Sequence, residues 1–198
     1  RKGGTDGEPI FRGMAGSRLN ILVDGQAVLG GCSMRMDSPT SYIFPEAYDE
    51  LLVTKGPQTV LYGPGASSGS VMFSHGINFF KNTNYSGRAS ILGGSFGRND
   101  EIIDLKTGSD KFYVKGTATN SRSGNYEDGN GNKVHSKYHR YSANGAIGFA
   151  ADENTSLELS GAFSDGEAAY ADRGMDGSQF ERTNYAIRLD RKSTRLNS

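Results

Sequence analysis

Alternation of apolar and polar residues constrains the fold of this chain more than any other feature of its sequence. Between residues 111 and 120, Phe112 and Val114 fall on one face of an extended chain, whereas Lys115 and Thr117 fall on the other. The same split recurs from residue 86 onward, and it predicts strands near residues 87–95, 99–107, 111–121, 139–150, 154–165 and 183–190. Strands of about ten residues with one apolar and one polar face are typical of an antiparallel transmembrane β-barrel, whose apolar face meets lipid.

The connections between these predicted strands alternate in length. Residues 108–110 and 151–154 are short turns, whereas residues 121–137 and 166–182 are long, polar and rich in Gly and Asp. A barrel predicts this asymmetry, because its periplasmic turns are short and its extracellular loops are long. We therefore expect about six strands of a larger barrel in the bacterial outer membrane.

Charge and hydropathy exclude two other classes of protein. The 22 basic and 22 acidic residues give no net charge, so composition offers no case for a nucleic-acid partner. No run approaches the roughly 18 apolar residues of a transmembrane helix, so any role in a membrane must come from a barrel or from the surface.

The first 80 residues have a different pattern, with short apolar runs between turn signals. Residues 19–25 predict a buried strand that ends in an Asp-Gly turn, and residues 51–54 predict a second strand stopped by Lys-Gly-Pro. A short helix or turn is expected between them, and another strand at residues 70–73. We therefore expect an α+β domain at 1–80, barrel strands at 81–191 and a non-native tail at 192–198, where the alternation stops.

Two stretches in the first domain, residues 17–26 and 52–73, resemble the plug domain of TonB-dependent outer-membrane receptors. The second stretch is the more specific, because a strand, a Lys-Gly-Pro-Gln turn, Leu-Tyr-Gly and a glycine-rich return follow one another in a fixed order. The resemblance implies a plug folded inside a barrel of about 22 strands. It also implies a partner, the TonB energy-transducing complex, which moves the plug so that a bound ligand enters the periplasm.

Within that family, residues 30–45 resemble the corresponding segment of the copper receptors, in which a Cys-x-x-x-Met pair supplies metal ligands. The pair here is Cys32 and Met36, and Met34 is a further sulfur on the same segment. Thiolate and thioether are soft ligands that select Cu(I) over harder divalent ions. The alternative is that Cys32 is a small buried hydrophobe and Met36 fills a gap in the core. We expect the first, with copper as the transported ligand and without any cofactor.

Other functions remain as alternatives. An iron-siderophore receptor of the same family would recognise its chelate through loop aromatics and basic residues, and Cys32 would then have no role. An outer-membrane adhesin would instead bind a partner through the loops 121–137 and 166–182.

Two further motifs are weaker. Residues 65–69 match the G-x-S-x-G pattern of hydrolases, but a strand is expected after them where that motif requires a helix, so we expect no enzyme. His135 and His139 stand four residues apart, as metal ligands can, yet they lie in or beside a polar loop and are interpreted as solvated surface residues.

Overall fold

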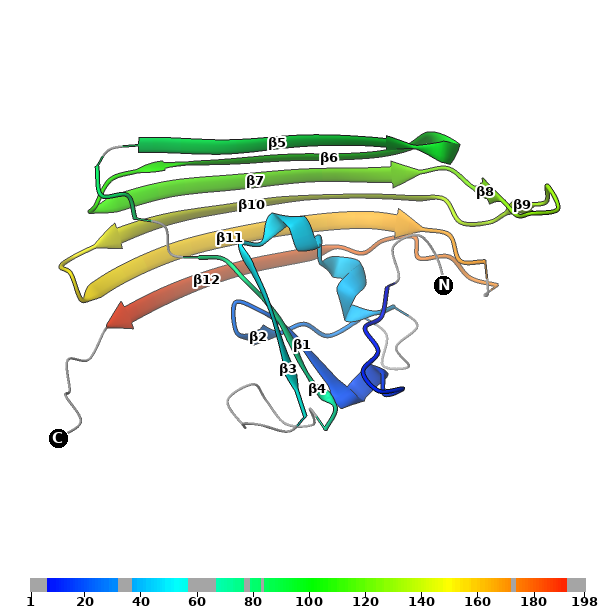
Figure 1. Ribbon diagram of the computed structural model, residues 1–198, viewed down its shortest axis with the longest axis horizontal. Helices are drawn as coiled ribbons and strands as arrows, with labels where there is room; N and C mark the ends of the chain where they lie inside the picture. Colours follow the sequence, from blue (N-terminus) through cyan, green and yellow to red (C-terminus); the bar gives the residue numbers. More distant parts are fainter. Residues whose placement is uncertain are drawn as a thin grey trace.

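Two large β-sheets and one small hairpin make up the described part of this protein in a computed structural model (Figure 1). The structure describes residues 7–31, 37–56, 67–76, 79–82, 84–171 and 174–191. The smaller sheet, formed by the first part of the chain, lies against one face of the larger, curved sheet, which we call the wall.

The smaller sheet has the strand order β2-β1-β4-β3. Its strands are β1 (Leu19–Val23), β2 (Gln26–Ala27), β3 (Glu50–Lys55) and β4 (Gly69–Ser74). β1 runs parallel to β4, whereas β2 and β3 run antiparallel to their neighbours. Its buried core comprises Ile21, Val23, Val28, Ile43, Val71 and Phe73. The strands predicted at 19–25, 51–54 and 70–73 are thus confirmed.

Local backbone chemistry explains where these strands turn. Asp24 and Gly25 both have positive φ, 50° and 81°, which matches the type I′ turn that Asp-Gly favours between two strands. Gly56, with φ 76°, follows β3 directly, as the predicted stop signal requires. The sequence thus places both turns correctly.

Among the described residues of this region, the helical elements are short 3₁₀ turns: η1 (Gly16–Arg18), η2 (Pro39–Tyr42) and η3 (Pro45–Ala47). A proline opens η2 and η3, where its fixed φ suits a first helical position. The short helix or turn expected before β3 is therefore a pair of 3₁₀ turns.

The larger sheet is an antiparallel meander with the strand order β12-β11-β10-β7-β6-β5. Its strands are β5 (Asn84–Gly94), β6 (Arg98–Gly108), β7 (Phe112–Ser123), β10 (Tyr138–Ala150), β11 (Thr155–Ala168) and β12 (Arg182–Arg191). The 3₁₀ turn η5 (Ser95–Gly97) joins β5 to β6. Every strand predicted from the alternation is present, with ends that differ by a few residues.

The long connection between β7 and β10 contains a small hairpin that the alternation did not predict. It consists of β8 (Tyr126–Glu127) and β9 (Lys133–Val134), which are too short to show a period. Its turn is ordered by Asp128, whose carboxylate accepts hydrogen bonds from the backbone N–H groups of Asn130 and Asn132, both at 2.9 Å. These bonds hold the pKa of Asp128 below its usual range.

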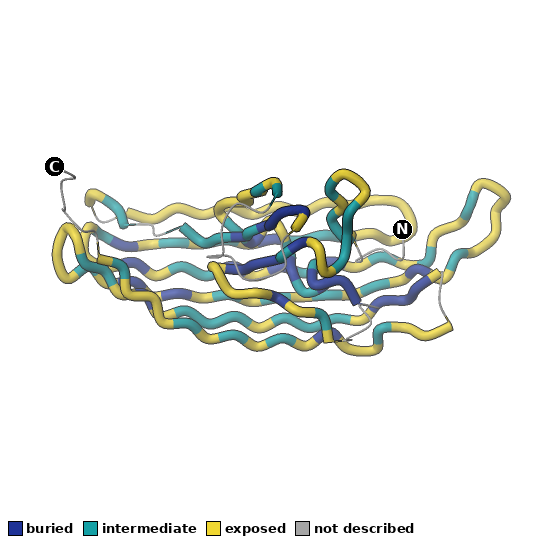
Figure 2. The backbone as a smooth tube through the Cα atoms, turned by 90° about the horizontal axis from the view of Figure 1, so that it is seen from below, coloured by how far each residue is buried: buried dark blue, intermediate teal, exposed yellow. Residues whose placement is uncertain are grey.

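Burial on the larger sheet is the reverse of that in a water-soluble protein. On β7 the polar residues Thr117 and Thr119 are buried at 8% and 6% exposure, whereas Val114 is 39% exposed. Ile147 on β10 and Leu159 on β11 are exposed on the same outer side. Buried stretches occur at several places along the wall strands, including the strand ends at Gly108 and Ala168 (Figure 2). The outer face is thus apolar and uncovered, as the wall of a transmembrane barrel requires.

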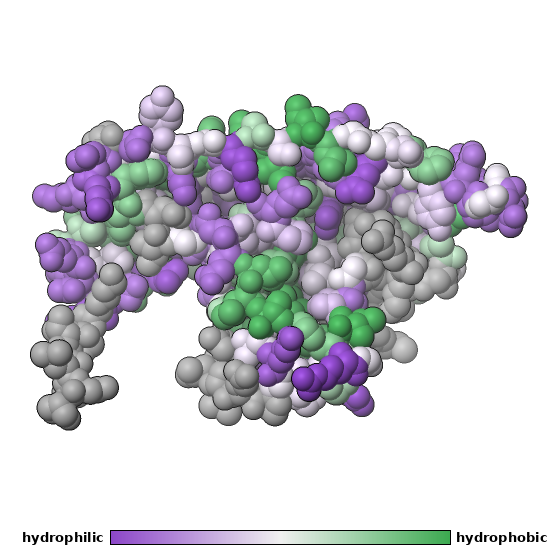
Figure 3. Space-filling model, viewed as in Figure 1, coloured by the Kyte–Doolittle hydropathy of each residue, from purple (hydrophilic) through white to green (hydrophobic). Residues whose placement is uncertain are grey.

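Hydrophobic side chains also gather on the smaller sheet, where its edge strand β3 exposes Leu51, Leu52 and Val53 (Figure 3). No helix in the described part of the chain is long and apolar enough to cross a membrane.

Replacing Ile187, a 77% exposed residue on the outer face of β12, by Arg should destabilise the folded barrel. The expected cost is about 2–4 kcal/mol near the middle of a bilayer, because a guanidinium there loses its hydration. Urea unfolding of the intact protein in lipid vesicles measures this cost. Asp190→Arg, on the other face of the same strand, is the matched control and should be tolerated better. Equal stability of both variants would contradict a lipid-facing outer surface.

Candidate functional site

The predicted metal ligands Cys32 and Met36, and the neighbouring Met34, lie outside the described residues, whereas the residues on both sides of them are described. The Oδ2 atom of Asp37 accepts hydrogen bonds from the N–H of Gly31 at 2.5 Å and from the hydroxyl of Tyr42 at 2.7 Å. The residues before and after the 32–36 segment are therefore held together at its base.

Close packing at this base requires a glycine. A Cβ atom on Gly30 would lie 2.6 Å from the carbonyl oxygen of Asp37 and 2.9 Å from its carboxylate. Both distances are far below van der Waals contact, so any larger residue at position 30 would push the two ends of the segment apart.

Tyr42 connects this base to the larger sheet. Burial, and then its hydrogen bond to Asp37, raises the pKa of Tyr42 to about 12, so its hydroxyl remains a donor at neutral pH. Its ring meets Phe180 edge to face, with ring centroids 5.7 Å apart. Phe180 belongs to the long β11–β12 connection and forms a buried cluster there with Ala168 and Tyr170. The base of the 32–36 segment thus contacts a loop at the end of the barrel wall that carries the long connections.

The two long connections are joined to each other at the same end. Nε2 of His135 lies 2.8 Å from the Asp176 carboxylate, and this hydrogen bond holds the pKa of Asp176 below its usual range. His139 contacts Asn120 instead, at 2.9 Å. The two histidines therefore have different partners and are not brought together, and both are exposed.

Three cations on the inner face of the wall bind the main chain of the smaller domain. Arg88 donates to the carbonyl of Glu46 at 2.8 Å, and Lys115 donates to that of Gly76 at 3.0 Å. Arg140 donates to the carbonyl of Ile43 at 3.3 Å. Sequence reasoning assigned Lys115 only to the polar face of its strand, because a period of two residues identifies a face but not its partner.

Two of these cations make additional contacts. Lys115, whose side chain is 10% exposed, also lies 3.8 Å from the Asp49 carboxylate. The guanidinium of Arg140 lies over the Phe44 ring, 5.0 Å from its centroid, in a cation–π contact. The segment from Ile43 to Asp49 is therefore fixed to the wall at several points.

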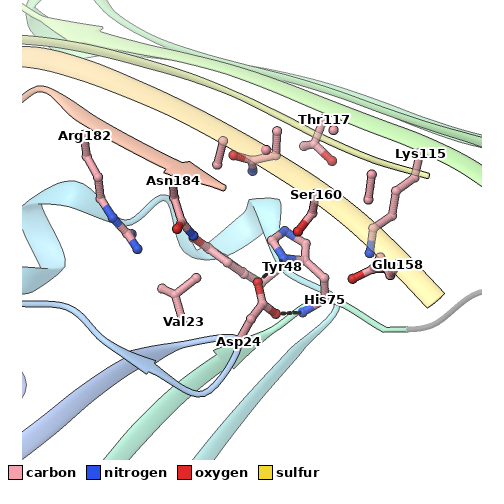
Figure 4. Close-up of a pocket in the computed structure, with 15 residues that line it drawn as sticks. Val23, Asp24, Tyr48, His75, Lys115, Thr117, Glu158, Ser160, Arg182 and Asn184 are labelled. Atoms are coloured by element: carbon pink, nitrogen blue, oxygen red, sulfur yellow. Dashed lines mark hydrogen bonds and ion pairs between the residues drawn. The ribbon is translucent and has the colours of Figure 1, made fainter. Parts of the chain in front are cut away.

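A pocket between the two sheets contains the other notable group of polar residues (Figure 4). His75, just beyond the end of β4, lies with Nδ1 2.8 Å from Oδ2 of Asp24, and its backbone N–H donates to Oδ1 at 2.8 Å. Burial opposes ionisation of Asp24, yet the hydrogen bonds from His75 hold the pKa of Asp24 below its usual range. Sequence reasoning missed this pair, because 51 residues separate its members.

Within the described residues, no group of three or more His, Cys, Asp or Glu side chains is arranged to hold a metal ion. The pocket is lined by polar residues of both parts of the fold: Asp24, Tyr48, His75, Lys115, Thr117, Asn144, Glu158, Ser160, Arg182 and Asn184.

Two comparisons with known proteins gave matches, and a third gave none. Residues 1–70 match the family model described as the TonB-dependent Receptor Plug Domain. The structure titled "Copper transporter OprC" is 47% identical over 98% of this chain, with a TM-score of 0.94. The chain spans only 30% of the length of that protein. No curated protein sequence matches the chain.

More distant structures share the fold alone. The siderophore receptor PirA from Acinetobacter baumannii is 17% identical over 92% of this chain and 31% of its own length, with a TM-score of 0.65. The ferripyoverdine receptor of the outer membrane of Pseudomonas aeruginosa is 16% identical over 83% of this chain and 21% of its own length, with a TM-score of 0.59. With its plug-domain match and its antiparallel wall strands, the chain belongs to the TonB-dependent outer-membrane receptors.

Proposed function

We propose that this chain is part of a receptor that binds and imports copper, with Cys32 and Met36 as metal ligands. The observation that carries the proposal is the 47% identity to the copper transporter OprC over nearly the whole chain. In this proposal residues 1–80 form the plug, residues 81–191 form the first barrel strands, and residues 192–198 are a non-native tail outside the described region. The protein acts by binding and transport, without a catalytic reaction.

The chemistry of the two sulfur atoms suits this role. Thiolate and thioether are soft donors, which favour Cu(I). Two donors do not complete a coordination shell, so further ligands must come from elsewhere in the receptor. The closed base formed by Gly31, Asp37 and Tyr42 supports the proposal, because preorganised flanks reduce the entropy lost when a segment binds metal.

The partners follow from the family. The TonB energy-transducing complex would displace the plug, and outer-membrane lipid would cover the apolar outer face of the wall. Inward movement then requires the contacts of Arg88, Lys115 and Arg140 with the plug to break, and each is a hydrogen bond that water can replace. The siderophore alternative is supported only by fold, since those receptors are 16–17% identical.

Replacing Cys32 by Ser in the intact receptor should abolish tight copper binding, because a hydroxyl is a hard and weak donor for Cu(I). Metal analysis of receptor purified from copper-supplemented cells should find about one tightly bound copper in the parent and none in the variant. Equal copper in both proteins would remove Cys32 from the site. Absence of copper from both would refute the copper proposal itself.

Gly30→Ala should weaken copper binding about tenfold or more without unfolding the receptor, because the new methyl group separates the ends of the 32–36 segment. Chelator competition measures the affinity. Gly93→Ala is the matched control: a Cβ there meets nothing within 4 Å, so its affinity should equal that of the parent. An unchanged affinity in Gly30→Ala would show that the base does not position the ligands.

A further inference from the structure

Three adjoining pockets follow the inner face of the wall between plug and barrel. The first is lined by Tyr42 and Phe180 at the end with the long loops. Tyr42 also lines the second pocket, and Tyr48 lines both the second and the third pocket. The third reaches His75, which Figure 4 shows among residues of both sheets. The series thus runs from the base of the 32–36 segment to the middle of the wall.

His75 presents one ring nitrogen that the described residues leave unused. Nε2 is buried and has no hydrogen-bond partner among them. The other nitrogen, Nδ1, faces the Asp24 carboxylate, which can only accept, so the proton of the neutral ring resides on Nδ1. The lone pair therefore resides on Nε2. A carboxylate that fixes the tautomer of a histidine in this way is the usual second-shell partner of a metal-binding imidazole.

The charged groups that line the third pocket are already engaged. Lys115 contacts Asp49 and the Gly76 carbonyl. Glu158 accepts a hydrogen bond from the hydroxyl of Tyr113, and Arg182 interacts with Tyr48. Two carboxylates, Asp24 and Glu158, balance the two cations of the lining, so the pocket opposes neither entry nor exit of a monovalent cation.

The geometry points to a second copper site, centred on Nε2 of His75, where the ion rests on its way from the 32–36 segment toward the periplasm. The inference rests on the proposed function. Imidazole suits copper, and the remaining donors would be neutral oxygen atoms and water. A site with a single strong protein ligand binds weakly, and weak binding is what a transport path requires, since an ion held tightly would not leave.

The test uses the intact receptor carrying Cys32→Ser, so that the weak site is measured without the tight one. Cuprous ion, buffered by a chromophoric chelator, is titrated into this protein and into Cys32→Ser/His75→Gln. Glutamine retains a donor for Asp24 but has no imidazole. The expected result is about one weakly bound copper in the first protein and its loss in the second. X-ray absorption of the residual copper should show nitrogen and oxygen neighbours without sulfur.

Two further variants keep the result interpretable. Asp24→Asn leaves His75 in place and should weaken the second site about tenfold, because an amide has no charge and only one oxygen to replace the two that Asp24 presents to His75. His139→Gln, in the exposed histidine bonded to Asn120, is the matched control and should leave binding unchanged. Heat-modifiable mobility on gels confirms that each variant is folded.

The outcomes separate this inference from the proposed function. The second site would be overturned if weak copper binding persisted in Cys32→Ser/His75→Gln. It would also be overturned if the Cys32→Ser protein bound no copper weakly. Neither result would affect tight binding at Cys32 and Met36 in the parent receptor. In uptake assays with intact cells, His75→Gln alone should slow copper entry while the affinity of the tight site stays constant, and an unchanged rate would count against a transit role.

Discussion

The polar inner face of the wall strands is the constraint on which the rest of the structure depends. A membrane-spanning strand satisfies its backbone through its neighbours and places apolar side chains outward, so its other face must be polar or small. That face needs polar partners, and the plug supplies them. Some polar side chains of this face bond to each other, as Thr117 does to Asp104 and Thr119 to Ser142. Others bond to the plug, where Lys115 and Arg140 donate to main-chain carbonyls.

The plug consequently combines two kinds of packing. Its own core, around Ile21, Val71 and Phe73, is apolar and holds its sheet together. Its contact with the wall includes the hydrogen bonds of Arg88, Lys115 and Arg140 to the plug main chain. Breaking hydrogen bonds in the presence of water costs little net free energy, whereas separating an apolar interface exposes its whole area. A domain that stays folded while it moves against its surroundings requires this division.

The sequence predicts those parts of the fold that depend on local periodicity. The wall strands follow from alternation, and the Asp24-Gly25 turn follows from backbone preference, since both signals lie within a few residues. The pairs Asp37–Tyr42 and Asp24–His75 were not predicted. Asp37 and Tyr42 are near in sequence, but the segment between them shows neither a helical nor a strand periodicity. Asp24 contacts His75 only because β1 pairs with β4 in the folded sheet. The metal ligands Cys32 and Met36 stay a prediction from resemblance, because the structure describes their flanks alone.

The wall cations bind main-chain carbonyls of Ile43, Glu46 and Gly76 rather than side chains. Every residue type supplies the same carbonyl group, so substitutions at these three positions keep their hydrogen-bond acceptors. The plug segment can therefore diverge in sequence while it remains seated on the same arginines and lysine. A receptor lineage built in this way can acquire a new ligand by altering plug loops, without any compensating change in the barrel.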